Sequence, residues 1–152
     1  MKRLLGLLLV MGMVGCWGPV DRSKLVKRDG LWYEGDSETP FTGVARGETH
    51  RNGQKALELT YKDGVLLLAA AWHEDGQKRM ERNFKDGEPE GLDTSWYYNG
   101  RKKSEVTYKD GKREGLATWW HGNGQKQAER TFKDGKKVSE KKWDPAGNEI
   151  KD

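Results

Sequence analysis

The sequence predicts an all-β fold, a single-layer antiparallel β-meander built from tandem hairpin repeats of 23 or 24 residues. Turn dipeptides recur along the chain, the segments between them are short and rich in β-branched and aromatic residues, and one pattern is written four times. The repetition indicates a repeat protein, in which one small unit cannot bury its apolar face alone and needs copies as neighbours.

The composition predicts one domain with a thin core. The chain has 152 residues, of which 34% are charged and 34% are hydrophobic. Such a composition is also found in disordered chains. Seven Trp, five Tyr and three Phe at mostly regular spacings argue for a folded protein instead.

The first residues have the pattern of a secretion signal. Two basic residues precede an uncharged apolar run over residues 4–14. As a helix this run would span about 16 Å, whereas the hydrocarbon core of a bilayer is roughly 30 Å thick. The run is therefore too short to cross a membrane and suits a signal peptide.

The run ends at Gly15, a small residue, followed by Cys16, the single cysteine of the chain. It resembles the lipobox of bacterial lipoproteins, with Met13 where Leu is usual. The resemblance implies cleavage before Cys16 and lipidation of its thiol and amine, which gives stable membrane anchoring. Trp17, rather than Asp, after the cysteine implies the outer membrane in a cell that has one. The alternative is an ordinary secretory signal followed by an unpaired thiol, which is awkward in an oxidising compartment.

These observations divide the chain into a lipoprotein signal peptide (residues 1–15), a lipidated tether (16–28) and a repeat β-sheet domain (29–152). Loss of residues 1–15 leaves 26 basic and 24 acidic residues, a net charge of about +2. Basic and acidic residues also alternate closely, as in Lys109-Asp110, and leave no long patch of one sign. Nucleic-acid binding needs clustered positive charge and is not expected.

Turn signals set the length of the strands. After Gly53 the turn glycines lie 11 to 13 residues apart, which excludes long helices and predicts about ten strands. Asn-Gly and Asp-Gly favour hairpins because both central residues of a type I′ turn need positive φ. The pairs are Asp29-Gly30, Asn52-Gly53, Asp63-Gly64, Asp75-Gly76, Asp86-Gly87, Asn99-Gly100, Asp110-Gly111, Asn123-Gly124, Asp134-Gly135 and Ala146-Gly147.

Aligned copies of the repeat share five kinds of residue. An aromatic residue precedes Lys-Asp-Gly, a tryptophan lies four residues before the second turn glycine, and a leucine, a glutamate and a lysine each keep one position. The series are Tyr61, Phe84, Tyr108 and Phe132; Trp72, Trp96, Trp120 and Trp143; Leu68, Leu92 and Leu116; Glu58, Glu81, Glu105 and Glu129; and Lys55, Lys78, Lys102 and Lys126.

The segment Gly91–Gly100, with its Trp-Tyr-Tyr-Asn-Gly ending, and the following Tyr108-Lys109-Asp110-Gly111-Lys112 and Gly115 resemble the bacterial variant of the MORN repeat. The resemblance covers residues 29–147, although residues 44–51 lack the aromatics and residues 65–71 lack the entry glycine. It implies a curved single-layer sheet that serves as a scaffold or interaction surface. Homologous chains are often described as antitoxin-like.

Burial favours a single aromatic face. With strict two-residue turns, Trp96 would lie on the same face as Glu105, and the Tyr108 series would lie on the other face. Each ring left exposed to water would then forgo roughly 1.5–3 kcal/mol of hydrophobic stabilisation. A one-residue bulge at a turn glycine would re-aim the strand and unite the two series. We therefore expect bulged turns and one aromatic face. Gly91 and Gly115 would then leave room for a ring from a neighbouring strand.

The histidines and glutamates suggest chemistry that their spacing argues against. His50, His73 and His121 occupy one repeat position, and equivalent positions lie two strands, about 9.6 Å, apart, whereas zinc ligands lie roughly 2.0–2.1 Å from the metal. The glutamate series is separated in the same way. The glycines belong to turns and none opens a helix. We expect a structural ladder, with no metal, no cofactor and no enzyme activity.

The apolar residues suggest interaction sites. The run Val65–Trp72 is apolar on both faces, so either residues 31–45 or a partner is expected to cover it. Tryptophans at repeat spacing are most often core, and exposed ones stack on successive sugars of a glycan such as peptidoglycan. The candidate interaction residues are Leu66, Leu67, Leu68, Trp72, Trp96 and Trp120, with Cys16 for lipidation. The open sheet edges offer a second route to partners, by strand addition.

Together these features predict a lipid-anchored, non-enzymatic repeat scaffold of a bacterial cell envelope that binds another protein. The anchor would hold it at the outer membrane, facing the periplasm or the surface, in a Gram-negative cell. Two alternatives remain at this point. One is an antitoxin or immunity-like protein that neutralises a toxin, and the other is a glycan-binding protein that uses the tryptophan series.

Overall fold

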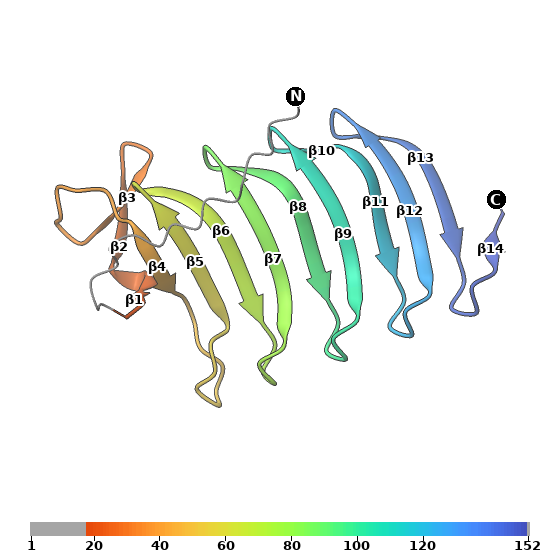
Figure 1. The fold of residues 1–152 in the computed structure, drawn as a ribbon, viewed down its shortest axis with the longest axis horizontal. Helices are drawn as coiled ribbons and strands as arrows, with labels where there is room; N and C mark the ends of the chain where they lie inside the picture. The colour runs from red at the N-terminus through yellow and green to blue at the C-terminus, as the bar shows by residue number, and fades with distance from the viewer. Residues whose placement is uncertain (1–17, 152) are drawn as a thin grey trace, which may run out of the picture.

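The computed structural model describes residues 18–151 and confirms the predicted fold class (Figure 1). Successive strands form one antiparallel meander, and the only parallel neighbours in the described chain are β1 and β4. In order across the sheet the strands are β1 (Val20–Asp21), β4 (Gly43–Arg46), β5 (Leu57–Lys62), β6 (Val65–Trp72), β7 (Lys78–Lys85), β8 (Glu88–Trp96), β9 (Lys102–Lys109), β11 (Gly115–Trp120), β12 (Lys126–Lys133), β13 (Lys136–Trp143) and β14 (Glu149–Ile150). The short β10 (Lys112–Arg113) pairs with β9.

Two kinds of turn alternate along the sheet and lie on opposite margins (Figure 1). In the turns at 29–30, 63–64, 86–87, 110–111 and 134–135 both central residues have positive φ, as in Asp110 (48°) and Gly111 (74°), which fits the expected type I′ turn. The Asp75-Gly76 pair differs from the expectation, because only its glycine has positive φ. In the other turns only the glycine is left-handed. There the Gly100 N–H donates to the Tyr97 carbonyl at 3.0 Å, which describes a type I turn closed by a bulged glycine. The bulge at a turn glycine is therefore present in every second turn.

The prediction of a single aromatic face is nevertheless wrong. The bulged turn shifts the pairing register of β8 and β9 by one residue. A second irregularity, at Lys103, shifts the register back: Trp96 pairs with Lys102, whereas Ser95 pairs with Ser104. Paired and alternate residues share a face, so Trp96 lies with Thr94 and Glu105, whereas Tyr108 lies with Asp93 and Val106. We name the two sides of the sheet the Trp96 face and the Tyr108 face.

Lysine side chains cover the rings on the Trp96 face and so limit the cost of splitting the aromatics. The Lys55 ammonium lies 3.8 Å from the centre of the Trp72 ring, and Lys78 lies 5.8 Å from that of Trp96. Each ammonium attracts the ring electrons, and its aliphatic stem shields apolar surface from water. Half-buried tryptophans are therefore tolerated on this side of the sheet.

Glycines pair with residues of the Tyr108 series, but the prediction that they leave room for a neighbouring ring is wrong. Gly91 pairs with Tyr108 across β8 and β9, and Gly115 pairs with Phe132 across β11 and β12. Both glycines have positive φ, 78° and 74°, at irregularities that other residues tolerate poorly. A Cβ atom added at either glycine would meet no atom within 4 Å, so the positive φ, and not space for a ring, requires glycine at these two positions.

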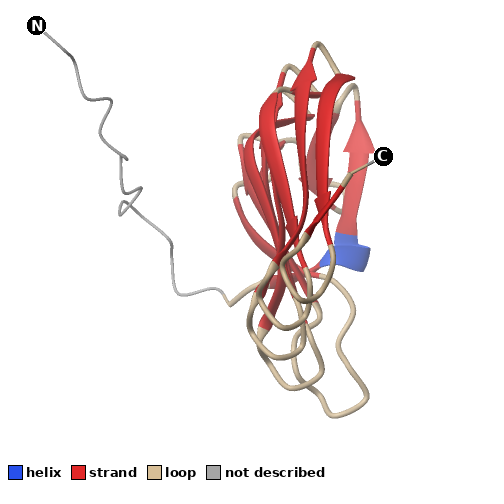
Figure 2. Ribbon diagram, turned by 90° about the vertical axis from the view of Figure 1, so that its right-hand side faces the viewer, coloured by secondary structure: helices blue, strands red, loops and turns tan. Residues whose placement is uncertain are grey.

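The N-terminal part of the described chain packs on the Tyr108 face over β4 to β6. Strands β2 (Leu25–Arg28) and β3 (Leu31–Glu34) form a separate hairpin, preceded by a 3₁₀ turn at Arg22–Lys24, and both lie beside the sheet (Figure 2). Leu25 joins Ala45 and Tyr61 in a buried cluster. The rings of Trp32 and Phe41 lie 6.0 and 5.8 Å from that of Tyr61.

This packing covers one end of the apolar strand β6, because Leu66 contacts the same cluster. Cover by residues 31–45 is thus confirmed for that end of the strand. The structure also differs from the expected tether over residues 16–28, since Val20–Asp21 pairs with β4 and Leu25 is buried. Apolar contacts hold this segment against the sheet, so residues 20–28 do not form a free linker.

A ladder of side-chain hydrogen bonds joins each repeat to the next at the bulged turns. The hydroxyl of Tyr97 donates to the Trp120 carbonyl at 2.7 Å, and Nε2 of His50, His73 and His121 lies 2.9, 3.1 and 2.9 Å from the carbonyls of Trp72, Trp96 and Trp143. A carbonyl oxygen only accepts, so each Nε2 carries a proton and donates it. The histidine ladder expected from the repeat spacing is present, with Tyr97 as its third member.

We predict that replacing Gly111 with Val destabilises the protein more than replacing Glu105 with Ala. Valine at φ 74° costs at least about 1–2 kcal/mol, and its Cβ would lie 2.5 Å from the Glu88 carboxylate. Glu105 loses a partly exposed ion pair with Lys102, worth about 0.2–1 kcal/mol. Thermal melts followed by circular dichroism would measure both, and equal melting temperatures would contradict the turn assignment.

The ladder predicts a second difference, between adjacent tyrosines. Tyr97→Phe removes only the hydroxyl that binds the Trp120 carbonyl and should lower the free energy of unfolding by about 0.5–1.5 kcal/mol. Tyr98→Phe is the matched control, because Tyr98 is 60% exposed and its ring, which stacks on His73, is retained. Urea unfolding of both variants would test this, and a Tyr98→Phe loss as large as that of Tyr97→Phe would refute the role of the ladder.

Candidate interaction surface

The Tyr108 face is open from β7 to β13, beyond the part that the N-terminal hairpin covers. Arginines lie over aromatic rings there, around a small buried cluster of Val106, Ala117 and Phe132. We name this region the arginine–aromatic surface. Its members are Arg82, Asp93, Tyr108, Arg113, Trp119, Arg130, Phe132 and Glu140, contributed by β7 to β13.

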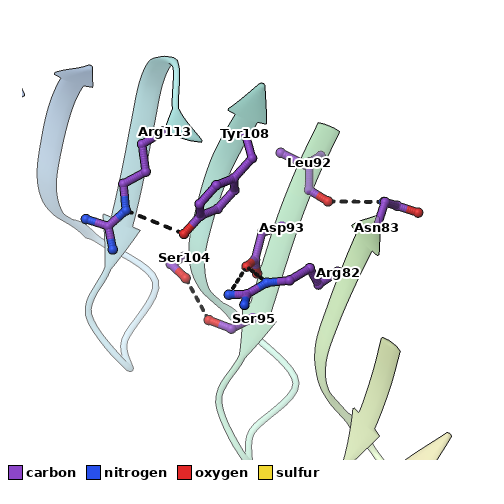
Figure 3. Close-up of polar contacts among 8 residues, drawn as sticks. All are labelled: Arg82, Asn83, Leu92, Asp93, Ser95, Ser104, Tyr108 and Arg113. Atoms are coloured by element: carbon purple, nitrogen blue, oxygen red, sulfur yellow. Dashed lines mark hydrogen bonds and ion pairs between the residues drawn. The ribbon is translucent and has the colours of Figure 1, made fainter. Parts of the chain in front are cut away.

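Arg82 and Asp93 form the first ion pair of this surface, across β7 and β8 (Figure 3). Arg82 Nη2 and Nε lie 2.5 and 2.6 Å from the Asp93 Oδ2 atom, and Asp93 is only 7% exposed. The guanidinium carbon lies 5.6 Å from the centre of the Tyr108 ring. The carboxylate therefore neutralises Arg82 and holds its planar group beside the aromatic ring.

Arg130 and Glu140 repeat the arrangement across β12 and β13. Arg130 Nε donates to Glu140 Oε1 at 2.6 Å, and its guanidinium lies 4.6 Å from the centre of the Trp119 ring. Lys137 also donates to Glu140, at 2.5 Å. The hydrogen bonds from Lys137 and Arg130 lower the pKa of Glu140 to about 2.

Arg113 lies between these two ion pairs and has a different environment. Its Nε donates to the Tyr108 hydroxyl at 3.5 Å, and its guanidinium lies 5.3 Å from the centre of the Phe132 ring (Figure 3). Within the described residues no carboxylate lies within 4.0 Å of it. Arg113 thus presents a positive charge to solvent, at a place fixed by two aromatic rings.

Polar contacts between backbone-proximal groups stiffen the strands beneath this surface. The hydroxyls of Ser95 and Ser104 lie 2.7 Å apart across β8 and β9 (Figure 3). Asn83 Nδ2 donates to the Leu92 carbonyl at 3.2 Å, where the register between β7 and β8 is irregular. The asparagine thereby satisfies a backbone acceptor that the interrupted ladder leaves available.

The six interaction residues predicted from the sequence do not form one surface. Leu66 lies on the Tyr108 face under the N-terminal hairpin, Leu67 occupies an irregularity between β5 and β6, and Leu68 lies on the Trp96 face. The tryptophans at 72, 96 and 120 follow Leu68 on that face. Cys16, predicted as the lipidation site, lies outside the described residues.

Sequence reasoning missed the arginine–aromatic surface, although a signal for it exists. The position after the repeat glutamate reads Leu59, Arg82, Val106, Arg130, and its cross-strand partner reads Ala69, Asp93, Ala117, Glu140. Apolar pairs thus alternate with ion pairs. That correlation between two columns of the repeat marks a cross-strand contact.

The described residues contain an open hollow but no cluster of metal ligands. Over residues 18–151 there is no group of three or more His, Cys, Asp or Glu side chains placed to hold a metal ion. An open hollow of about 400 Å³ lies near the C-terminal end, lined by Trp119, Arg130, Trp143 and Ile150 among others. No helix in residues 18–151 has the length and hydrophobicity of a membrane span.

Comparison with known proteins identifies the repeat. The family described as "MORN repeat variant" matches residues 89–110 and 113–134, two consecutive copies. No curated protein matches the sequence. A solved structure titled "Crystal structure of GtfA/B complex bound to UDP and GlcNAc" aligns with 75% of this chain and 22% of that chain, at 16% identity and a TM-score of 0.26. A likeness at this TM-score carries no argument about fold or function.

The environment of Glu140 predicts a titration that NMR can measure. Because its folded-state pKa is depressed, the stability that Glu140 contributes is present above its ordinary pKa of 4.5 and is lost as the pH falls towards about 2. Lys137→Ala should raise the pKa of Glu140, whereas Lys141→Ala, on the other face of the strand, should not. An ordinary pKa for Glu140 in the native protein would contradict the bonding described above.

Proposed function

Because the chain carries MORN repeats of the variant type, which are non-catalytic interaction repeats, we propose that it is a lipid-anchored scaffold of a bacterial envelope. On this proposal the arginine–aromatic surface binds another protein. The repeats supply a rigid sheet, and the surface supplies the contacts. Cys16 supplies the anchor.

The observation that carries the proposal is the kind and arrangement of side chains on the Tyr108 face. Trp, Tyr and Arg are the residues in which binding energy at protein interfaces concentrates. Here Trp119, Tyr108 and three arginines lie together, and Asp93 and Glu140 fix two of the guanidinium groups in advance. Groups that are already ordered lose less conformational entropy when a partner binds, so the surface is suited to recognition.

The lipid anchor would place this surface close to the membrane. Val20, where the sheet begins, is four residues after Cys16, and four extended residues span at most about 14 Å. The N-terminal end of the sheet would therefore lie near the headgroups, with the arginine–aromatic surface further along the row of strands. A partner would therefore bind at a distance from the bilayer that is set by the number of strands between β1 and the arginine–aromatic surface.

Glycan binding by the tryptophan series is less favoured by the geometry. Lysine ammonium groups lie over Trp72, Trp96 and Trp143, where a sugar ring would have to stack. Those lysines also pair with Glu58, Glu81 and Glu129, so displacing them would break an ion pair at each step. An antitoxin-like role remains a prediction and differs from the proposal only in the identity of the partner.

Trp119 and Trp120 offer a matched test, because these neighbours lie on opposite faces of β11. In cross-linking and capture of the full-length protein from its own cells, Trp119→Ala should reduce recovery of the partner at least about tenfold. Trp120→Ala should leave that recovery unchanged. Retention on insoluble peptidoglycan that is lost in Trp120→Ala and kept in Trp119→Ala would instead establish glycan binding.

Two further variants test the binding surface and the lipid anchor separately. Arg113→Ala removes an exposed side chain and should reduce capture without lowering the melting temperature, which separates recognition from unfolding. Cys16→Ser should release the protein from membranes while it keeps its β-type circular dichroism. A Cys16→Ser protein that still sediments with membranes would refute the anchor, and full capture by both Trp119→Ala and Arg113→Ala would refute the binding surface.

A further inference from the structure

The two edges of the sheet differ in how completely their strands are paired. At the N-terminal end β4 pairs with β1, and the β2–β3 hairpin packs nearby (Figure 1). At the C-terminal end β13 has eight residues, but β14 pairs only with Lys142 and Trp143. In the part of the chain that the structure describes, no strand pairs with the outer edge of residues 136–141. Their outward backbone groups are available to another chain.

This open edge is positively charged. Residues 136–141 contain three lysines and one glutamate, a net charge of +2. The one carboxylate, Glu140, is shared by Arg130, Lys137 and Lys142. Among the described residues no carboxylate lies within 4.0 Å of the Lys136 or Lys141 ammonium group, although Glu129 pairs with Lys141 across β12 and β13. These lysines are close together in the sequence, and the fold places them at the sheet edge.

We propose that the open edge of β13, residues 136–141, binds an extended acidic segment of a partner protein by strand addition. Six residues of strand span about 20 Å and offer main-chain hydrogen bonds to an incoming chain. Glutamate or aspartate side chains on that chain would lie opposite Lys136 and Lys141, where cross-strand pairs of opposite charge are favourable. The backbone provides the affinity and the lysines provide the selection.

The same lysines disfavour the alternative occupant, a second copy of this chain. Pairing two β13 edges would bring two segments of charge +2 together, and like charges opposite each other destabilise a sheet. Lysines on an edge strand disfavour pairing with most other strands, and an acidic strand is the kind whose pairing they favour. This edge adjoins the arginine–aromatic surface and shares Glu140 with it, but it binds through the backbone of β13. Trp119→Ala should therefore leave it intact.

Labelled synthetic octapeptides of alternating valine with glutamate or with lysine would test the proposal on the full-length protein in detergent. Fluorescence anisotropy should show binding of the glutamate peptide and at least about tenfold weaker binding of the lysine peptide. Amide hydrogen exchange of residues 136–141 should slow on binding, while that of β7 and β8 should not change. Lys136→Glu with Lys141→Glu should abolish binding, and Lys85→Glu with Lys109→Glu, at turns elsewhere, should not.

Three outcomes would overturn the proposal. A glutamate peptide N-methylated at alternate residues keeps its charge but cannot pair as a strand, so equal binding of that peptide would reduce the contact to charge attraction. Unchanged exchange at residues 136–141 would place the peptide elsewhere. Protection of these amides in the absence of peptide, lost on dilution, would show that a second copy occupies the edge.

Discussion

The hydrogen bond that each bulged turn sends to the next repeat is the interaction on which the rest of the sheet depends. No large side chain in the described chain is fully buried, and the buried residues are mostly alanines and a few aromatics. A core of this kind cannot by itself fix how successive hairpins stack. The bonds from His50, His73, Tyr97 and His121 to main-chain carbonyls 22 or 23 residues further on supply that constraint.

Asparagine side chains add a second line of bonds beside the first. Asn52, Asn99 and Asn123 donate from Nδ2 to the carbonyls of Glu74, Gly122 and Pro145. Each of these turns is thus tied to the next turn on the same margin of the sheet, two strands along. This explains why a histidine or tyrosine and an asparagine recur at fixed places in the repeat without forming a metal or catalytic site.

Local signals in the sequence were sufficient for the architecture. An Asp-Gly pair favours the left-handed φ of Asp110 and Gly111, and glycine at position 91 permits the positive φ (78°) of that irregular position. The distribution of aromatics between the faces did not follow, because it depends on the irregularity at Lys103 that cancels the bulged turn, and no residue type marks that position. The packing of Leu25 was missed because its partners, Ala45 and Tyr61, are distant in sequence.

The candidate surface was predictable only in part. Series of identical residues drew attention to the Trp96 face. On that face Lys102 pairs with Glu105, three residues further on, because the register irregularity at Lys103 turns both side chains to the same side of the sheet. The Tyr108 face varies between copies, from Val106 opposite Ala117 to Arg130 opposite Glu140. Invariance within the repeat therefore identified residues that hold the stack together. Departures from the repeat identified the ion pairs of the proposed binding surface.

The alternation of two kinds of turn limits how such a chain can change in length. Adding or removing a single strand would bring two turns of the same kind together on opposite margins and would leave a histidine or asparagine without the carbonyl that it binds. Adding or removing a pair of strands restores every contact. The sheet therefore grows and shrinks in whole repeats, and the distance between its two edges is set in discrete steps of about 9.6 Å, the width of two strands.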